Sequence, residues 1–251
     1  MIDKIAFNTA RMTALSENGE GYLGIGRLSE KTVHRTLKLY YEPNEANHEI
    51  ELLGSVADIK NESGIIEIQR ASFAYLVPKL ARFLPHYTVT VVHPITAKKR
   101  VKRLDPKTGE ISFSGRTVKG KTVFDSALEI YKIREFIGTE GFTLVLLLLE
   151  CDEYKIPDKN ARRGRGGERR LEAIPTEILA EYVLKTPDDY LSLLPDTLGE
   201  AFTELDFRKA VKSRSRYAYY YLRLLVDLGV LTRERDGRKY IYSRIKNEHS
   251  C

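Results

Sequence analysis

The chain has 251 residues, of which 42% are hydrophobic and 30% charged, a composition that suits one large or two modest folded domains and excludes global disorder. No run of roughly 18 uncharged apolar residues occurs, so no transmembrane helix is predicted, and two cysteines, Cys151 and Cys251, are too few for a disulfide framework. The start of the chain lacks the pattern of a secretory signal, so we expect a cytoplasmic protein with no membrane partner.

Three islands of basic residues stand out in a chain whose net charge is +6. Residues 96–121 hold nine Lys and Arg against two acids, residues 159–170 hold six against one, and residues 208–216 hold five against none. A single charge run is usually a solvated face of a protein. Three runs, each beside a segment with other features of nucleic-acid binding, favour a partner that carries phosphate groups.

The N-terminal half of the chain predicts alternating helices and strands. Residues 1–21 lack a clean periodicity and are expected to form a flexible arm. A helix is predicted from Ser29, which can cap its N-terminus, to Glu42, because Pro43 then ends it. Three strands are predicted over residues 49–53, 56–60 and 65–69, a second helix over residues 71–84 and a fourth strand over residues 87–95. Pro78 predicts a bend or a break in this second helix.

The next segments complete an α/β domain that we place at residues 22–158. The basic residues 96–121 contain a turn signal and are expected to form an excursion from the domain, such as a hairpin. Val123–Ile137 predicts a helix, and Phe142–Glu150 has the apolar run of a buried strand. Alternation of strands and helices is typical of an α/β domain.

The character of the sequence changes after residue 158. Residues 159–170 are rich in Arg and Gly, lack an apolar anchor and predict a basic linker. The C-terminal domain, residues 171–251, is expected to be mainly helical, with a strand pair around Asp236-Gly237. Its helical patterns cover residues 173–185, 187–194, 205–212 and 213–228.

Asp58 and Glu67 give the sharpest signal in the sequence. If residues 61–64 form a loop, Asp58 pairs with Glu67 across two antiparallel strands. Side chains alternate between the faces of a strand, so the two carboxylates point to the same side, and Gln69 joins them. The opposite face, directed to the core, holds Ile59, Ile66 and Ile68.

Two carboxylates directly opposite each other repel, so the fold needs a group that neutralises them. A divalent cation such as Mg²⁺ or Mn²⁺ suits these oxygen ligands. The alternative is an ordinary hairpin whose carboxylates face solvent. Isoleucines on both strands argue for a central position in the sheet and against a simple surface hairpin, and both the metal site and the solvent-facing pair stay open.

Asp58, a turn and Glu67-Ile68-Gln69, followed by a helix and a strand, resemble the PD-(D/E)XK nuclease superfamily. The order over residues 29–95, which is helix, three strands, helix and strand, is similar to the core of that family. The spacing of His34 and Lys38 in the first helix resembles a group of uncharacterised bacterial proteins that pair such a core with a C-terminal winged helix. The same group resembles this chain at Ile66–Gln69 and Val91–Ile95.

The resemblance implies a restriction-endonuclease-like core with a mixed central sheet flanked by helices. It also implies metal-dependent hydrolysis of phosphodiester bonds, by a magnesium-dependent deoxyribonuclease. Asp58, Glu67 and the backbone carbonyl of Ile68 would hold Mg²⁺ or Mn²⁺, and Gln69 would orient the attacking water. Double-stranded DNA is the expected substrate, and a homodimer is one expected arrangement, because many nucleases of this fold act as dimers.

The sequence departs from the family motif at two positions. Ala57 replaces the proline before the aspartate, and Gln69 replaces the lysine of the ExK motif. Lys79 in the following helix either replaces that lysine or is an ordinary solvated residue. Three residues of the first helix share one face and form either part of the catalytic pocket or a surface ladder: Glu30, His34 and Lys38.

Residues 202–245 resemble a winged-helix domain. Thr203 is a candidate cap with Asp206 three residues on, a longer helix follows from Ser213, and a hairpin turns at Asp236-Gly237. In helix-turn-helix proteins the N-terminal end of the second helix meets bases and phosphates. The expected nucleic-acid-binding residues of the linker, this helix and the hairpin are Arg162, Arg163, Arg165, Lys212, Arg214, Arg216, Arg235 and Arg238.

Two alternatives stay open at the level of the sequence. Winged helices also bind proteins, and Tyr219–Tyr221 is either a dimer surface or, for Tyr221 at least, part of the core. The loss of the motif lysine also allows a catalytically inactive DNA-binding regulator or adaptor that retains the nuclease fold. No GxGxxG, Walker A or nucleophile-elbow motif supports another α/β enzyme class.

Overall fold

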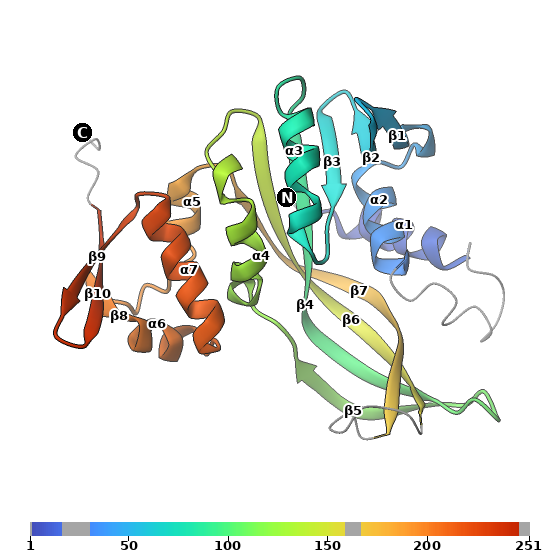
Figure 1. The fold of residues 1–251 in the computed structure, drawn as a ribbon. Coiled ribbons are helices and arrows are strands. Elements are labelled where there is room, and N and C mark those ends of the chain that lie inside the picture. The colour runs from blue at the N-terminus through green and yellow to red at the C-terminus, as the bar shows by residue number, and fades with distance from the viewer. Residues whose placement is uncertain (1, 17–30, 159–166, 246–251) are drawn as a thin grey trace. The chain divides into compact units, whose positions relative to one another are not determined.

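The computed structural model describes residues 2–16, 31–158 and 167–245. It is a mixed α/β structure with a large mixed sheet flanked by helices, and a second, smaller sheet (Figure 1). The large sheet has seven strands in the order β1-β2-β3-β4-β6-β7, with β5 paired to β4. Its strands are β1 (His48–Leu52), β2 (Ser55–Asn61), β3 (Gly64–Ile68), β4 (Val89–Leu104), β5 (Ile111–Lys119), β6 (Phe142–Pro157) and β7 (Glu168–Leu184).

The chain divides into two compact units that interleave along the sequence. The first unit contains residues 1–62, 94–121 and 147–181. The second unit contains residues 63–93, 122–146 and 182–251. Among the described residues, no helix has both the length and the apolar character needed to cross a membrane.

The first unit begins with two helices that pack together, α1 (Lys4–Ser16) and α2 (Lys31–Tyr41). Ala10 and Ala14 of α1 are buried with Leu39 of α2, and the rings of Phe7 and Tyr40 meet edge to face. The prediction of a flexible arm is therefore wrong for residues 4–16. The helical spacing of Phe7, Ala10 and Ala14 was the signal, and small alanines made that apolar face hard to recognise.

A tight hairpin joins β1 to β2, after the short 3₁₀ helix η2 (Glu45–Asn47). Leu52 pairs with Ser55, which leaves Leu53 and Gly54 as a two-residue turn with φ of 51° and 71°. Positive φ at both positions is typical of a type I′ turn, whose twist matches that of the flanking strands. The two predicted strands are confirmed with nearly the predicted bounds.

The basic segment 96–121 forms the predicted hairpin, because β5 folds back antiparallel onto the second half of β4. By contrast, β7 replaces both the end of the predicted linker and the predicted helix 173–185. Glu, Leu and Ala give this segment a helical propensity, but Leu171, Ala173 and Ile178 are buried in a long strand. Pairing within the sheet overrides intrinsic propensity here.

In the second unit, β3 is buried along its whole length and runs parallel to β4, with Glu67 beside Val91. The crossover contains η3 (Phe73–Tyr75) and α3 (Val77–Phe83). The break at Pro78 is confirmed, because Pro78 lies in the first turn of α3, where its missing N–H costs no hydrogen bond. The predicted helix 123–137 is likewise divided into η4 (Val123–Ser126), α4 (Ala127–Lys132) and η5 (Arg134–Phe136).

The C-terminal part of the second unit combines helices with the smaller sheet (Figure 1). Phe124, Phe207 and Tyr221 form an aromatic cluster with ring centroids 4.9–5.9 Å apart, and the Tyr221 hydroxyl donates to the carbonyl of Tyr190 at 2.6 Å. Tyr221 is therefore a core residue. The elements are α5 (Pro187–Leu191), β8 (Ala201–Thr203), α6 (Glu204–Val211), α7 (Ser215–Asp227), β9 (Leu231–Asp236) and β10 (Lys239–Arg244), with sheet order β8-β10-β9.

Candidate functional site

Two of the three predicted residues on the first helix contact the hairpin that follows it. In the first unit, Nε2 of His34 lies 3.2 Å from Oδ2 of Asp58. Nζ of Lys38, a buried side chain, lies 2.7 Å from Oε1 of Glu49. His34 and Lys38 are thus not a surface ladder. Glu30, the third predicted member, lies outside the described residues.

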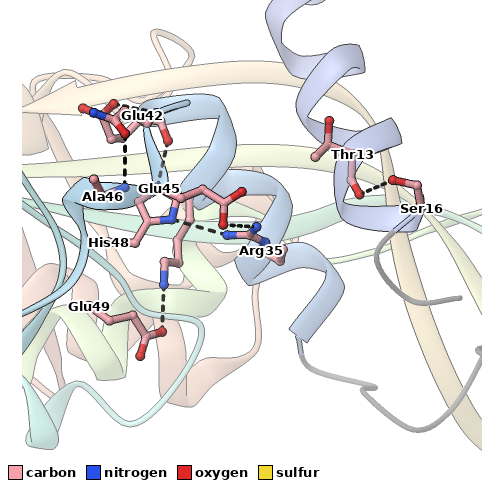
Figure 2. A network of polar contacts seen from close by, with 10 residues as sticks. Thr13, Ser16, Arg35, Glu42, Glu45, Ala46, His48 and Glu49 are labelled. Atoms are coloured by element: carbon pink, nitrogen blue, oxygen red, sulfur yellow. Dashed lines mark hydrogen bonds and ion pairs between the residues drawn. The ribbon is translucent and has the colours of Figure 1, made fainter.

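Further polar contacts tie α2 to the segment between α2 and β1 (Figure 2). Nη2 of Arg35 lies 2.6 Å from Oε2 of Glu45, and its Nη1 lies 3.4 Å from Nδ1 of His48. His48 Nε2 contacts the carbonyl of Glu42 at 2.8 Å, which fixes the imidazole between the helix end and the strand. The network holds the start of β1 against α2 and so positions Glu49.

Glu49 is a residue that the sequence analysis missed. The β1–β2 register pairs His48 with Ile59 and Ile50 with Ala57, so Glu49 stands opposite Asp58. Its φ of 54° is unusual for a residue with a side chain and indicates local strain. The hydrogen bond and the charge of Lys38 lower the pKa of Glu49, while the nearby charge of Asp58 opposes that shift. Antiparallel alternation between β1 and β2 was the signal that could have found it.

Glu67 is the most buried of the predicted site residues, with 2% of its surface exposed. Within the second unit, Nζ of Lys79 in α3 lies 2.8 Å from Glu67 Oε2. A carboxylate taken out of water needs a compensating charge, and Lys79 supplies one. Lys79 is therefore not an ordinary solvated lysine.

Both the backbone and the side chain of Gln69 form hydrogen bonds with neighbouring backbone groups. Its backbone N–H donates to the carbonyl of Val92 at 2.9 Å, and its side-chain amide donates to the carbonyl of Ala71. His93 Nδ1 lies 2.6 Å from the Gln69 carbonyl, and His93 Nε2 lies 2.9 Å from Oγ of Ser126. Because a carbonyl only accepts, Nδ1 carries the proton in the neutral imidazole and Nε2 accepts from Ser126.

The predicted metal ligands belong to different units. Asp58 lies in the first unit, whereas Glu67 and Ile68 lie in the second. Ile68 is buried at the end of β3. Across residues 2–16, 31–158 and 167–245, no cluster of three or more His, Cys, Asp or Glu side chains that could hold a metal ion is present.

The first basic island, residues 96–121, is largely neutralised along β4. Lys99, Arg100, Lys102 and Arg103 each form an ion pair with an acid on β6 or β7. Burial lowers the pKa of Lys102, but hydrogen bonds to Asp152 and Tyr154 outweigh it and raise the pKa overall. Four of the nine cations of this island therefore balance charge inside the protein.

The predicted nucleic-acid-binding residues near α7 and the β9–β10 hairpin are exposed. Lys212 ends α6 with φ of 52°, Arg214 stands at the N-cap position of α7 without a side-chain capping bond, and Arg216 lies in the first turn of α7. Arg235 and Arg238 lie on either side of the hairpin turn. The three predicted residues of the linker, Arg162, Arg163 and Arg165, lie outside the described residues.

Comparison with known proteins gives a family and a relative. The profile of a family described as Domain of unknown function (DUF8091) matches residues 31–185. An uncharacterized protein of Treponema pallidum (strain Nichols) is 25% identical over 222 residues, which span 88% of this chain and 87% of that protein. No solved structure matches the chain. The matched range contains α2, β1 to β3 and α3, and it ends before α6 and α7.

Proposed function

The chain belongs to the DUF8091 family, and we propose that it hydrolyses phosphodiester bonds of nucleic acid with the help of Mg²⁺ or Mn²⁺. The observation that carries the proposal is the ion pair between Glu67 and Lys79. Glu67 occupies the acidic position of the ExK-like motif, and Lys79 brings a positive charge to that carboxylate from the next helix. The pair thereby offers the charge that Gln69 cannot supply.

The order of elements supports a restriction-endonuclease-like core. Helix α2 precedes the strands β1, β2 and β3, and the crossover through α3 leads to β4, which pairs with β3 in parallel. Asp58 lies on the second of these strands and Glu67 on the third, as the resemblance requires.

Within the second unit the proposed metal ligands are Glu67 and the backbone carbonyl of Ile68, and the resemblance alone adds Asp58 of the first unit. These donors are all oxygens, which suits a hard cation that keeps several of its own waters. A bound metal would polarise the scissile phosphate and lower the pKa of a water molecule. Lys79 would balance the charge of Glu67 in the absence of substrate and donate to a phosphate oxygen in its presence. We assign this role to Lys79 rather than to Gln69, whose side chain already donates to Ala71.

Nucleic acid is the proposed substrate because of the exposed basic residues around α7. The sequence of α6, α7 and a three-stranded sheet supports a winged-helix arrangement. Arg214 and Arg216 mark the N-terminal end of α7, where a helix-turn-helix protein meets DNA. Double-stranded DNA is the substrate that this module would bind.

The test is cleavage of linear, circular, single-stranded and branched DNA with Mg²⁺, Mn²⁺ or EDTA. We expect metal-dependent cleavage by the wild type and a loss of at least 100-fold in Glu67→Gln and Lys79→Met. Lys185→Met, which removes an exposed lysine elsewhere in the second unit, is the matched control and should cleave normally. Far-ultraviolet circular dichroism would establish that each variant is folded. Cleavage that survives in folded Glu67→Gln would contradict the proposal.

A DNA-binding regulator or adaptor that lacks catalysis is the second candidate. The engaged side chain of Gln69 favours it, since no residue of the motif itself then acts on the attacking water. Binding of DNA without cleavage under any metal condition would support this candidate. Arg214→Gln and Arg216→Gln should weaken DNA binding under both candidates, so cleavage alone separates them.

A further inference from the structure

The β4–β5 hairpin carries a pair of lysines that directly oppose each other. Lys98 of β4 is the cross-strand partner of Lys119 of β5, and both side chains are exposed. Neither ammonium has an ion pair or hydrogen bond with any described residue. Like charges directly opposite on antiparallel strands destabilise the pairing, because their Cβ atoms lie about 5 Å apart. The pairing is therefore one that an anionic ligand would stabilise.

The contrast with the rest of β4 makes this pair distinctive. Lys99, Arg100 and Lys102 have carboxylate partners at 2.7–3.1 Å. These carboxylates come from Asp152 and Glu153 of β6. Ion pairs thus neutralise Lys99, Arg100 and Lys102, whereas the side chains of Lys98 and Lys119 are exposed to solvent. Arg116 of β5 is also exposed and lacks an ion pair among the described residues.

An exposed aromatic ring lies on the same strand. Phe113 of β5 is 50% exposed and is the partner of Lys102. Lys98, Arg100 and Lys102 occupy alternate positions of β4 and therefore share one face. Their partners on β5 are Lys119, Thr117 and Phe113, with a register shift between Arg100 and Lys102. A ring and two unneutralised lysines on one face of the β4–β5 hairpin combine a stacking surface with phosphate-binding charge.

We propose that this face binds a single-stranded segment of nucleic acid, with Lys98 and Lys119 on its phosphates and Phe113 stacked on a base. The inference rests on the proposed hydrolysis of nucleic acid and adds that the segment bound at this face is single-stranded. A base pair in a duplex keeps its faces stacked on its neighbours, so Phe113 could stack only on an unpaired base. The exposed residues near α7 remain the duplex-binding surface.

The test measures binding in EDTA, where metal-dependent cleavage cannot occur. Fluorescence anisotropy would follow the intact chain with a labelled oligothymidine and with a labelled hairpin duplex. Phe113→Leu keeps an apolar side chain but removes the aromatic face, and we expect roughly 5- to 150-fold weaker binding of the single strand. Binding of the duplex should stay within twofold of the wild type. Equal weakening for both ligands, or no weakening for the single strand, would overturn the proposal.

The lysines have a separate readout in the salt dependence of binding. Each phosphate contact to a single strand contributes about 0.7 to the slope of log K against log salt. Lys98→Gln with Lys119→Gln should therefore lower that slope by about 1.4, while Lys185→Gln should leave it unchanged. An unchanged slope in the double variant would overturn the proposal. So would a double variant that loses binding to anionic phospholipid vesicles but keeps its binding to the oligonucleotide. Because no arm depends on cleavage, a catalytically inactive chain would still give a decisive result.

Discussion

Nζ of Lys79 in α3 lies 2.8 Å from Oε2 of Glu67 in β3. Glu67 is almost fully buried, whereas the side chain of Lys79 keeps 28% of its surface in contact with solvent. The lysine therefore compensates the charge of a carboxylate that is shielded from water. The lysine can also leave the carboxylate without losing all of its hydration, which suits a residue that exchanges one anion for another.

Lys79→Met should destabilise the second unit because it removes a positive charge from a buried carboxylate. Loss of one partner of a fully buried pair costs roughly 3–5 kcal/mol, and the partial exposure of Lys79 lowers our expectation to about 2 kcal/mol. Urea unfolding followed by circular dichroism would measure the change. The double variant Glu67→Gln, Lys79→Met should recover at least half of the loss, since no buried charge then remains. A double variant that is less stable than Lys79→Met would contradict this account.

Glu129 should contribute a pH-dependent part of the stability. Burial raises the pKa of its carboxyl, but hydrogen bonds from the Lys132 side chain and the backbone N–H of Phe73 outweigh burial and lower the pKa below 4.5. A carboxyl whose pKa is lowered in the folded state stabilises the protein above its unfolded pKa. That stability is lost as the pH falls through the folded pKa.

Glu129→Gln should therefore flatten the decline in the free energy of unfolding between about pH 5 and pH 3. At pH 7 the variant should be less stable than the wild type by about 1 kcal/mol, and below pH 3 the two should converge. Urea titrations at several pH values would measure this. Glu135→Gln, at an exposed carboxylate of η5, is the matched control. Parallel pH profiles of the wild type and Glu129→Gln would rule out the assignment.

The sequence was sufficient where the information is local. Turn residues and alternation predicted β1, β2 and β3, and Thr203 with Asp206 predicted the capping box at the start of α6. The sequence was insufficient for β7, where only pairing with other strands selects a strand over a helix. The prediction of a helix over residues 173–185 was wrong because a local sequence pattern carries no information on contacts with distant strands.

The candidate site shows the same division. Spacing alone singled out Asp58 and Glu67, but it could not show that Lys79 meets Glu67 rather than water. Glu49 escaped notice because its role depends on the hairpin register and on Lys38, eleven residues earlier. The joint metal site of Asp58 and Glu67 stays a prediction, as does their register across β2 and β3.

Thr203→Ala should weaken the start of α6. The Thr203 hydroxyl accepts from the backbone N–H of Asp206 at 3.2 Å, and the Asp206 carboxylate accepts from the backbone N–H of Thr203 at 2.9 Å. Loss of such a cap costs about 1 kcal/mol. Amide hydrogen exchange in residues 204–211 should accelerate in Thr203→Ala and stay near the wild-type rate in Thr203→Ser, which keeps the hydroxyl. Equal acceleration in both variants would show that the threonine methyl, rather than the hydroxyl, matters.

Gly64→Ala should be far more destabilising than Gly54→Ala, although both glycines have positive φ and lie at strand ends. At Gly54, with φ of 71°, an added Cβ meets nothing within 4 Å, so only the backbone strain of about 1 kcal/mol remains. At Gly64, with φ of 123°, the Cβ would lie 2.5 Å from the carbonyl oxygen of Thr88.

The Thr88 carbonyl cannot move away freely, because it accepts a hydrogen bond from the N–H of Ile65 at 2.9 Å where β3 meets β4. Strain at a disfavoured φ costs about 1–3 kcal/mol and overpacking costs a similar amount, so we expect about 3 kcal/mol or more for Gly64→Ala. Thermal unfolding of both variants would test the order. If Gly54→Ala were the less stable variant, the close approach of β3 to Thr88 would not be the constraint that fixes glycine at residue 64.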